Sequence, residues 1–288
     1  MIRLGVIADG DSVSSQSYDL INWSKSQNSI ELICLIDQVN ANESVFSMIK
    51  ISVLKGDFIS KLLLKVITSA EKILLNKYIG NHHKTYKKIS SFFEHTLKVN
   101  VIKSKSRVVY RYPDRDIYSI KSMNLDLILR CGGGILKGEI LNSSRLGIVS
   151  FHHADNRINR GGPAGFWEVY EKSPTTGFTI QILNDELDGG NVLKRGSFLT
   201  RFSYLLNQAD LHKKANYYMK QLLLEISKKG SLPKFKDTYI YSARLYKTPN
   251  VNQQIKYLLI VSSIVFRLLR GKLTPFKERW QLAYSFKP

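Results

Sequence analysis

The 288-residue sequence is poor in acidic residues and in cysteine. It has 23 Asp and Glu against 43 Lys and Arg, which gives a formal net charge of +20. A surplus of this size favours anionic partners such as phosphates, nucleotides, RNA or an acidic membrane surface, although a lysine-rich solvated surface explains it equally well. The two cysteines, Cys34 and Cys131, lie in apolar strand-like runs. We therefore expect buried free thiols in a reducing cytoplasm rather than a disulfide.

Four further absences narrow the class of protein. The N-terminus MIRLGVIADG has neither a long apolar region nor a cleavage site, so we see no signal peptide, and the apolar run 257–266 is too short to span a bilayer. No Cys/His cluster has zinc-binding spacing, and we expect no metal. The G-x-G-x-x-G fingerprint of a dinucleotide site is missing after residues 3–8 and at 131–134, where CGGG instead suits the close approach of a flat ligand or a neighbouring segment.

Short apolar runs alternate with helical segments, which predicts an α/β protein. Six runs are typical of buried strands, and they are residues 3–10, 30–37, 125–134, 145–153, 176–183 and 191–200. A helix at 12–27 between the first two makes a βαβ unit, which implies a parallel sheet, whereas the last two are expected to pair antiparallel. An amphipathic helix follows at 210–230, with Asp210 at its start and Gly230 at its end.

Two basic segments stand apart from this pattern. Residues 50–105 have 12 Lys, no Arg and three acids, and the stretch 58–79 alternates apolar clusters with lysines in a helical pattern. Residues 244–280 hold eight basic residues and one acid around the apolar run 257–266. Each segment can lie on an anionic membrane surface, or it can pack on the core with its lysines in water. The sequence leaves both interpretations open.

Polar side chains gather where the strand 145–153 ends. His152 and His153 follow an uncharged run, and ligands of parallel sheets bind at the carboxyl ends of strands. A histidine there can exchange a proton near neutral pH. Asp188 lies in a Gly-Gly turn between two strands, where a carboxylate can support a histidine. Alone, each has a plain structural explanation, a strand-end hydrogen bond or a hairpin-turn aspartate; together they predict a site.

The run 126–193 resembles the catalytic core of the folate-dependent formyltransferases, which include methionyl-tRNA, glycinamide ribonucleotide and sugar N-formyltransferases. It contains, in order, a strand, a loop ending in Ile-Leu, a histidine, an Arg-Gly with a Pro, a Thr-Gly-x-Thr strand and an Asp-Gly turn. The resemblance implies a Rossmann-like, mostly parallel sheet with flanking helices. It also suggests a catalytic domain at 1–205 with a basic helical insertion at about 45–100, and a C-terminal helical extension at 206–288.

The resemblance places the family's catalytic histidine on His152 and its catalytic aspartate on Asp188. The family's asparagine, which donates to the formyl oxygen, falls on Ser150, and its Pro-Ser falls on His153 and Ala154. Losing one such donor can cost about 3 kcal/mol of barrier, so the chain is a divergent branch. The remaining implied contacts are Gly134, Ile135, Leu136 and Leu187 for the pterin, and His153, Asn156 and Arg160 for the acceptor.

The activity implied by the resemblance is transfer of a formyl group from 10-formyltetrahydrofolate to an amine, in the cytoplasm. The basic surplus suits a phosphorylated or nucleotide-linked amino sugar as a small anionic acceptor. Methionyl-tRNA and glycinamide ribonucleotide are alternatives, and nucleic acid is not favoured, since no tRNA-binding barrel is evident after residue 200. A non-catalytic module in glycan assembly is a further alternative, because the family's asparagine is missing. Peripheral contact with an anionic membrane also stays open.

Overall fold

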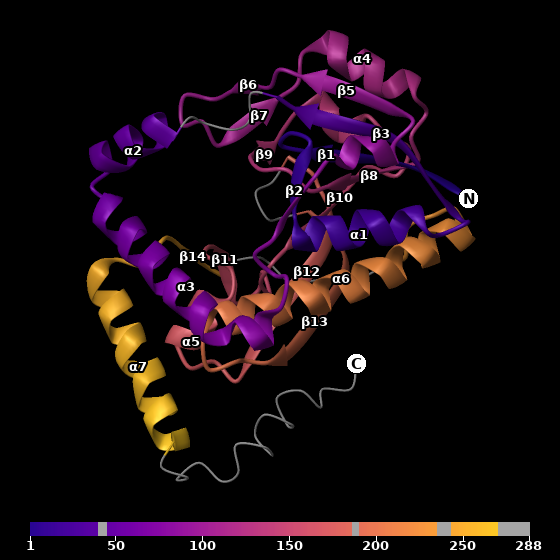
Figure 1. Cartoon of the computed structure of the whole chain (residues 1–288). Coiled ribbons are helices and arrows are strands. Elements are labelled where there is room, and N and C mark those ends of the chain that lie inside the picture. Colours follow the sequence, from indigo (N-terminus) through magenta and orange to yellow (C-terminus); the bar gives the residue numbers. More distant parts are fainter. Residues whose placement is uncertain (40–44, 186–189, 235–242, 270–288) are drawn as a thin grey trace.

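A computed structural model of the chain describes residues 1–39, 45–185, 190–234 and 243–269. Its centre is a seven-stranded sheet in the order β13-β12-β10-β8-β1-β3-β5 (Figure 1). Five neighbouring strands run parallel, β12 is antiparallel to β10, and β13 is antiparallel to β12. The strands are β1 (Ile2–Ala8), β3 (Ile30–Gln38), β5 (His95–Val99), β8 (Leu127–Arg130), β10 (Ile148–His152), β12 (Thr175–Ile182) and β13 (Asn191–Leu199). The predicted α/β fold with a mostly parallel sheet is confirmed.

The edge strand β5 is a finding that the sequence did not suggest. The segment 95–99 lies inside the range assigned to the helical insertion, yet it pairs in parallel with β3, from His95 opposite Cys34 to Val99 opposite Gln38. Of its five residues only Val99 is buried, whereas nearly all of β1 and β3 is buried. An edge strand can keep polar side chains in water, so it lacks the continuous apolar run that identified the central strands.

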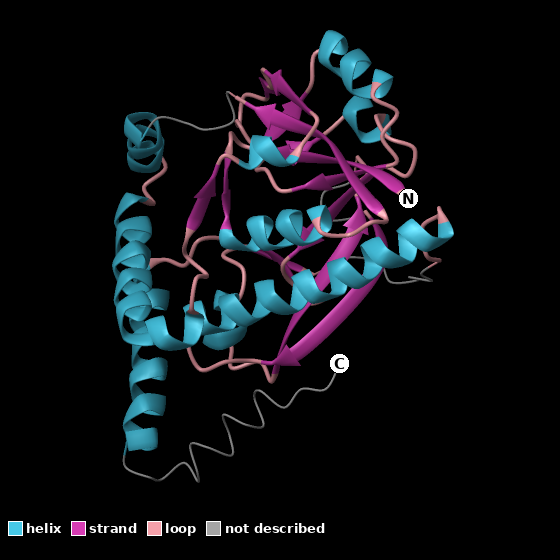
Figure 2. Ribbon diagram, turned by 45° about the vertical axis from the view of Figure 1, so that its right-hand side comes forward, coloured by secondary structure: helices cyan, strands magenta, loops and turns pink. Residues whose placement is uncertain are grey.

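Two helices cover one face of the sheet, namely α1 (Ser15–Lys25) and α6 (Tyr204–Lys229), which lie side by side in Figure 2. Leu20 of α1 and Met219 of α6 share a buried cluster with Leu4 of β1. Ser14 caps α1 by accepting a hydrogen bond from the Ser17 amide, and Gly230 ends α6 in the left-handed conformation. The predicted boundary between a catalytic domain and a C-terminal extension, at residues 205 and 206, stays a prediction. Helix α6, which begins near this boundary, packs against β12 and α1.

The opposite face of the sheet is covered by α4 (Asp114–Ser122) and the short 3-10 helix η2 (Glu139–Asn142). A second cluster joins Ile117 and Ile120 of α4 and Ile140 of η2 to Ile7 and Ile128 of the sheet. The two faces therefore have separate apolar cores, and the strands between them are buried from both sides.

Three helices form a layer beside the sheet: α2 (Val45–Leu54), α3 (Phe58–Ile79) and α7 (Val251–Leu269). The helix predicted at 58–79 is confirmed, and the apolar run 257–266 lies within α7. Glu71 lies on the buried side of α3, where its carboxylate accepts hydrogen bonds from the Leu205 amide at 2.8 Å and from the Tyr257 hydroxyl. In the described part of the chain, no helix is long and apolar enough to cross a membrane.

Short elements complete the described chain. They are β2 (Ser12–Ser14), β4 (Thr85–Lys87), η1 (Ile89–Phe92), β6 (Ile102–Lys103), β7 (Val109–Arg111), β9 (Ile135–Leu136), β11 (Asn159–Gly161), α5 (Phe166–Tyr170) and β14 (Arg244–Tyr246). The pairing of β2 with β4 and of β11 with β14 ties the helical layer to the carboxyl ends of β1 and β10. Those ends carry the polar residues described next.

Candidate active site

His152 and His153 point to opposite faces of the sheet at the end of β10. Ser150 and His152 pair with Gln181 and Thr179 of β12, so these four side chains share one face. His153 lies on the other face, where its Nε2 is 2.8 Å from Nε2 of Gln16 in α1. His152, the predicted catalytic histidine, and His153 therefore lie in different environments.

The His152 ring is buried and its orientation is fixed. Its Nε2 lies 3.1 Å from the main-chain oxygen of Asn159, and this oxygen can only accept, so Nε2 carries the proton. Nδ1 is then the proton acceptor of the neutral ring. Asn159 in turn donates from Nδ2 to Oε1 of Glu168 at 3.0 Å. Burial raises the pKa of Glu168, and the hydrogen bond from Asn159 opposes that rise.

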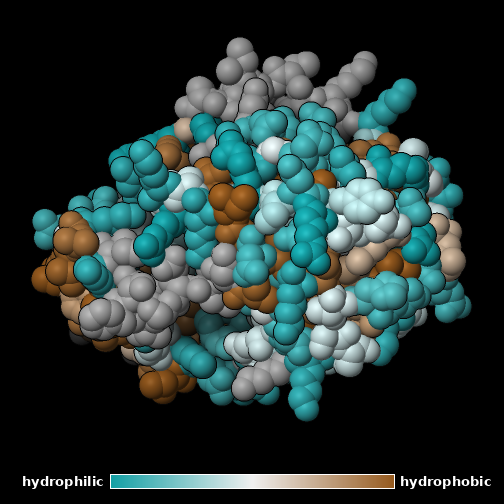
Figure 3. Space-filling model, turned by 90° about the horizontal axis from the view of Figure 1, so that it is seen from above, coloured by the Kyte–Doolittle hydropathy of each residue, from teal (hydrophilic) through white to brown (hydrophobic). Residues whose placement is uncertain are grey.

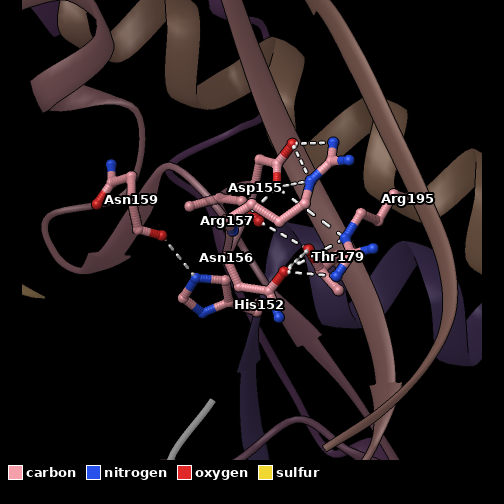
Figure 4. A network of polar contacts seen from close by, with 8 residues as sticks. His152, Asp155, Asn156, Arg157, Asn159, Thr179 and Arg195 are labelled. Atoms are coloured by element: carbon pink, nitrogen blue, oxygen red, sulfur yellow. Dashed lines mark hydrogen bonds and ion pairs between the residues drawn. The ribbon is translucent and has the colours of Figure 1, made fainter. Parts of the chain in front are cut away.

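Asn156 is held in a polar network behind His152 (Figure 4). Its Oδ1 accepts from Nη2 of Arg195 at 3.0 Å and from Oγ1 of Thr179 at 3.4 Å, and the residue is fully buried. In the same network the Asp155 carboxylate accepts hydrogen bonds from Arg157. Burial alone would raise the pKa of Asp155, but these hydrogen bonds and the charge of Arg157 outweigh it, so the pKa is lowered. The predicted acceptor contact at Asn156 stays a prediction; its amide oxygen is already engaged within the protein.

Ser150 lies beside an amide that the sequence did not single out. Ser150 is buried, and its hydroxyl makes a long 3.3 Å hydrogen bond to the oxygen of Phe151. Gln181, directly across in β12, is also buried, and its Oε1 has no hydrogen-bond partner among the described residues. A Cβ at Gly190 would come within 3.2 Å of the Gln181 amide carbon, so this side chain reaches toward the turn between β12 and β13.

The predicted residues Leu187 and Asp188 lie outside the described residues. The chain on either side of them is in place: Ile182 pairs with Val149 and with Asn191, and Gly190 packs so closely on the Ile182 oxygen that a Cβ there would be 2.3 Å from it. The turn therefore begins opposite Val149, three residues before His152, or about 10 Å along β10 at the rise of a strand. The partnership of Asp188 with His152 stays a prediction.

The glycines at 132–134 make close contacts with the protein's own side chains. A Cβ at Gly132 would be 2.7 Å from the Asp9 carboxylate, and one at Gly134 would be 2.3 Å from the Tyr110 ring. Of the two interpretations of CGGG, the structure thus shows the close approach of neighbouring segments. Leu136 is buried in the core, and Gly138 donates to Asp185 at 3.3 Å, which places the loop after β9 beside the start of the 186–189 turn.

His153 belongs to a cluster of four histidines with His82, His83 and His212. Its ring centroid is 4.5 Å from that of His212, which is 4.9 Å from that of His82, and His82 is 4.7 Å from His83. Burial lowers the pKa of His153 to about 3 and that of His83 to about 4. In the described ranges no group of three or more His, Cys, Asp and Glu residues is arranged to hold a metal ion.

A cavity of about 750 Å³ opens beside this cluster, between α1, α6 and the segment 77–86. Its charged and aromatic walls include Lys77, Lys213, Lys220, Tyr18, Tyr86 and Tyr217. Asp19 and Asp210 also line it, but they pair with Lys220 and Arg201. The cavity therefore presents cationic and aromatic groups, a combination that suits an anionic ligand with a ring.

Sequence reasoning missed Gln181, Asn159 and Glu168, as well as the partnership of His153 with α6. Glu168 and Asn159 lie within the quoted motif, but nothing in their spacing shows that they reach His152. The remaining predicted acceptor residue, Arg160, lies in β11, where it pairs with Leu245 of β14. Its predicted role in binding the acceptor stays a prediction.

Comparisons with known proteins relate the chain to formyltransferases. No protein-family model matches the sequence. A methionyl-tRNA formyltransferase of Staphylococcus epidermidis is 27% identical over 110 residues, which are 38% of this chain and 35% of that protein, so the match spans about a third of it. A sugar N-formyltransferase of a Shewanella species has a similar structure, with a TM-score of 0.51 and 14% identity over 90% of this chain and 88% of that one.

Two further solved structures share the fold. An N-formyltransferase of Helicobacter canadensis, in complex with folinic acid and dTDP-3-aminofucose, gives a TM-score of 0.50 at 10% identity and covers 91% of this chain and 80% of its own. A phosphoribosylglycinamide formyltransferase of Anaplasma phagocytophilum gives a TM-score of 0.50 at 13% identity, and the match covers 85% of this chain and 99% of that one. At these identities the likeness establishes the fold, and the resemblance expected from residues 126–193 is confirmed at that level.

Proposed function

We propose that this chain, which has the formyltransferase fold, transfers a formyl group from 10-formyltetrahydrofolate to the amine of a small anionic acceptor. The observation that carries the proposal is the placement of His152. It is buried at the carboxyl end of β10, in the part of the sheet where parallel folds bind ligands, and Asn159 fixes its tautomer. Its neutral ring therefore has an acceptor nitrogen to take a proton from an attacking amine.

The residues around His152 suit the remaining requirements of acyl transfer. The hydroxyl of Ser150 and the amide of Gln181 lie on the same face of β10 and β12, and both can donate to an oxygen that gains negative charge. Gln181 would thus supply the amide that the family places at position 150. Asp188 would hold the charge that develops on His152, and the Arg195 network keeps the strand end rigid.

The residues present fit a folate co-substrate at the edge between β9 and the 186–189 turn. The Gly138 to Asp185 hydrogen bond brings these two segments together, and the buried Gln181 oxygen has no hydrogen-bond partner in the described ranges. Gly134, Ile135, Leu136 and Leu187 would hold the pterin, largely through main-chain atoms, since the Leu136 side chain is buried in the core. When bound, the folate supplies the formyl group.

We place the anionic part of the acceptor in the cavity between α1 and α6, which opens on the His153 side of β10, so its amine would pass the carboxyl end of β10 to reach His152. Lys77 and Lys213 line it beside four tyrosines, and its wall reaches His212, whose ring contacts that of His153. A phosphorylated or nucleotide-linked amino sugar combines a ring, an anionic group and an amine, and it is complementary in charge to these lysines. The net charge of +20 would also raise the encounter rate of such an acceptor.

Methionyl-tRNA is the second candidate, because the curated relative that matches 110 residues of this chain is a methionyl-tRNA formyltransferase. The described residues beyond β13 fold as two helices and a three-residue strand.

Mass spectrometry of candidate acceptors tests the proposal. The protein would be incubated with 10-formyltetrahydrofolate and, separately, with nucleotide-linked amino sugars, glycinamide ribonucleotide and methionyl-tRNA. We expect an amino sugar to gain the mass of one formyl group, and His152→Ala to abolish the gain. His95→Ala, at an exposed histidine of β5, is the matched control and should be active. Formylation of no amine, or equal activity of both variants, contradicts the proposal.

A further inference from the structure

Helix α3 has two apolar sides, and only one of them is packed. Ile67, Glu71 and Ile79 are buried against α6 and α7. Five large apolar side chains of the helix are exposed by 50% to 79%; Leu74 stands apart, and the other four are Ile59, Leu62, Val66 and Ile73. At 3.6 residues per turn, their positions fall within an arc of about 60°, so they form one continuous stripe along the helix. A stripe of this kind on a packed helix indicates an interaction surface.

Helix α2 extends the stripe at the N-terminal end of α3. Ile49, Val53 and Leu54 are exposed by 44%, 57% and 78%. Viewed from above, hydrophobic side chains gather at the left-hand edge of the molecule, the side on which α2 and α3 lie in Figure 1 (Figure 3). We call the stripe and these three residues together the α2–α3 face.

The charge around the α2–α3 face has one sign. Six lysines and no arginine lie between residues 49 and 79, and they are Lys50, Lys55, Lys61, Lys65, Lys72 and Lys77. The same range holds two acids: Glu71 is buried, and Asp57 pairs with Lys61 at 2.9 Å. Lys61, Lys65 and Lys72 lie within an arc of about 40° along one border of the stripe. Exposed apolar residues with a cationic border are the pattern of a helix that lies in a membrane interface.

We propose that the α2–α3 face docks this protein on an anionic membrane surface. The apolar stripe would enter the boundary between headgroups and acyl chains, while the lysines contact anionic headgroups. A second copy of the chain is a poorer occupant, because a two-fold contact would bring the same lysines of two +20 chains together. Lys77 also lines the cavity proposed for the acceptor, whereas Lys65 and Lys72 do not, so these two lysines test the proposal independently of the catalytic one.

Vesicle sedimentation tests the proposal with the full chain. We expect binding to phosphatidylcholine vesicles that contain 30% phosphatidylglycerol, weaker binding as salt is raised, and little binding to pure phosphatidylcholine. Lys65→Glu with Lys72→Glu should weaken binding about thirtyfold or more, at about 1 kcal/mol for each lysine lost. Ile59→Ser with Ile73→Ser should weaken it about tenfold or more.

A charge-matched control separates this surface from general basicity. Lys228→Glu with Lys229→Glu makes the same change in net charge at the exposed end of α6 and should leave binding nearly unchanged. Circular dichroism verifies that each variant is folded. The proposal is overturned if neutral and anionic vesicles bind alike, or if the control loses as much affinity as the lysine variant. It is also overturned if light scattering shows a dimer that Ile59→Ser with Ile73→Ser dissociates while vesicles do not bind.

Discussion

Acid should destabilise this protein through its histidine cluster, and His153 allows the size of the effect to be worked out. Burial lowers the pKa of His153 from 6.5 to about 3, so the folded protein holds it neutral while the unfolded chain protonates it. A group with a depressed pKa contributes its stability above the unfolded value and loses that contribution as the pH falls from 6.5 toward 3. At pH 5.5 the loss for this one ring is about 1.4 kcal/mol.

The neighbouring rings act in the same direction. The pKa of His83 is lowered to about 4, and burial also lowers the pKa values of His82 and His212. Glu71 and Glu168 act in the opposite direction, because burial raises their pKa values and acid then favours the folded state. The pH dependence of the free energy of unfolding thus combines opposite contributions from the histidines and from these two acids. Comparing variants at one residue is needed to isolate the contribution of a histidine.

Urea unfolding of His153→Gln against the unsubstituted protein makes that comparison. Between pH 7.5 and 5.5 the unsubstituted protein should lose about 1.4 kcal/mol more free energy of unfolding than the variant, because the variant cannot take up this proton. His95→Gln, at an exposed edge-strand position, is the control and should follow the unsubstituted protein. Equal losses in His153→Gln and the unsubstituted protein would refute the assignment of a buried neutral ring.

Three other substitutions test separate parts of the structure. Glu71→Ala should lower the free energy of unfolding by about 2–3 kcal/mol, because the Leu205 amide and the Tyr257 hydroxyl lose their acceptor, and Glu71→Gln should cost less; urea titrations that show equal losses would contradict this. Gly196→Ala should cost about 1–3 kcal/mol, because its Cβ would lie 2.3 Å from the Phe178 ring, and an unchanged melting temperature would count against that packing. Gln181→Ala should lower kcat about 100-fold with little change in stability, and full activity would exclude Gln181 as an oxyanion donor.

The central strands were predictable because buried strands need mostly apolar residues, and such runs can be recognised in the sequence. β1 and β3 are mostly apolar in sequence and buried along nearly their whole length, since helices cover the parallel part of the sheet on both faces. The strand β5 was not predictable from the sequence, because it pairs at an exposed edge of the sheet and its residues are mostly polar. The buried side of α3 was equally hidden, since Glu71 serves there as a hydrogen-bond acceptor and not as a surface acid.

The candidate site was predictable only in its sequence-local part. His152 and Ser150 stand two residues apart on one strand, so their common face follows from the strand period. Gln181 and Glu168 reach the site through strand pairing and a connecting hydrogen bond, and neither relation has a fixed sequence spacing. The same holds for the histidine cluster, whose members come from α6, β10 and the turn after α3.

The central claim is that His152 and Asp188 act on one bound folate, and a double-mutant cycle on the affinity for folinic acid tests it most directly. His152→Ala, Asp188→Ala and the double variant would be titrated by calorimetry beside the unsubstituted protein. The account predicts that folinic acid binds and that the two losses couple by about 1 kcal/mol or more. Losses that add independently, or an affinity that neither substitution changes, would contradict it.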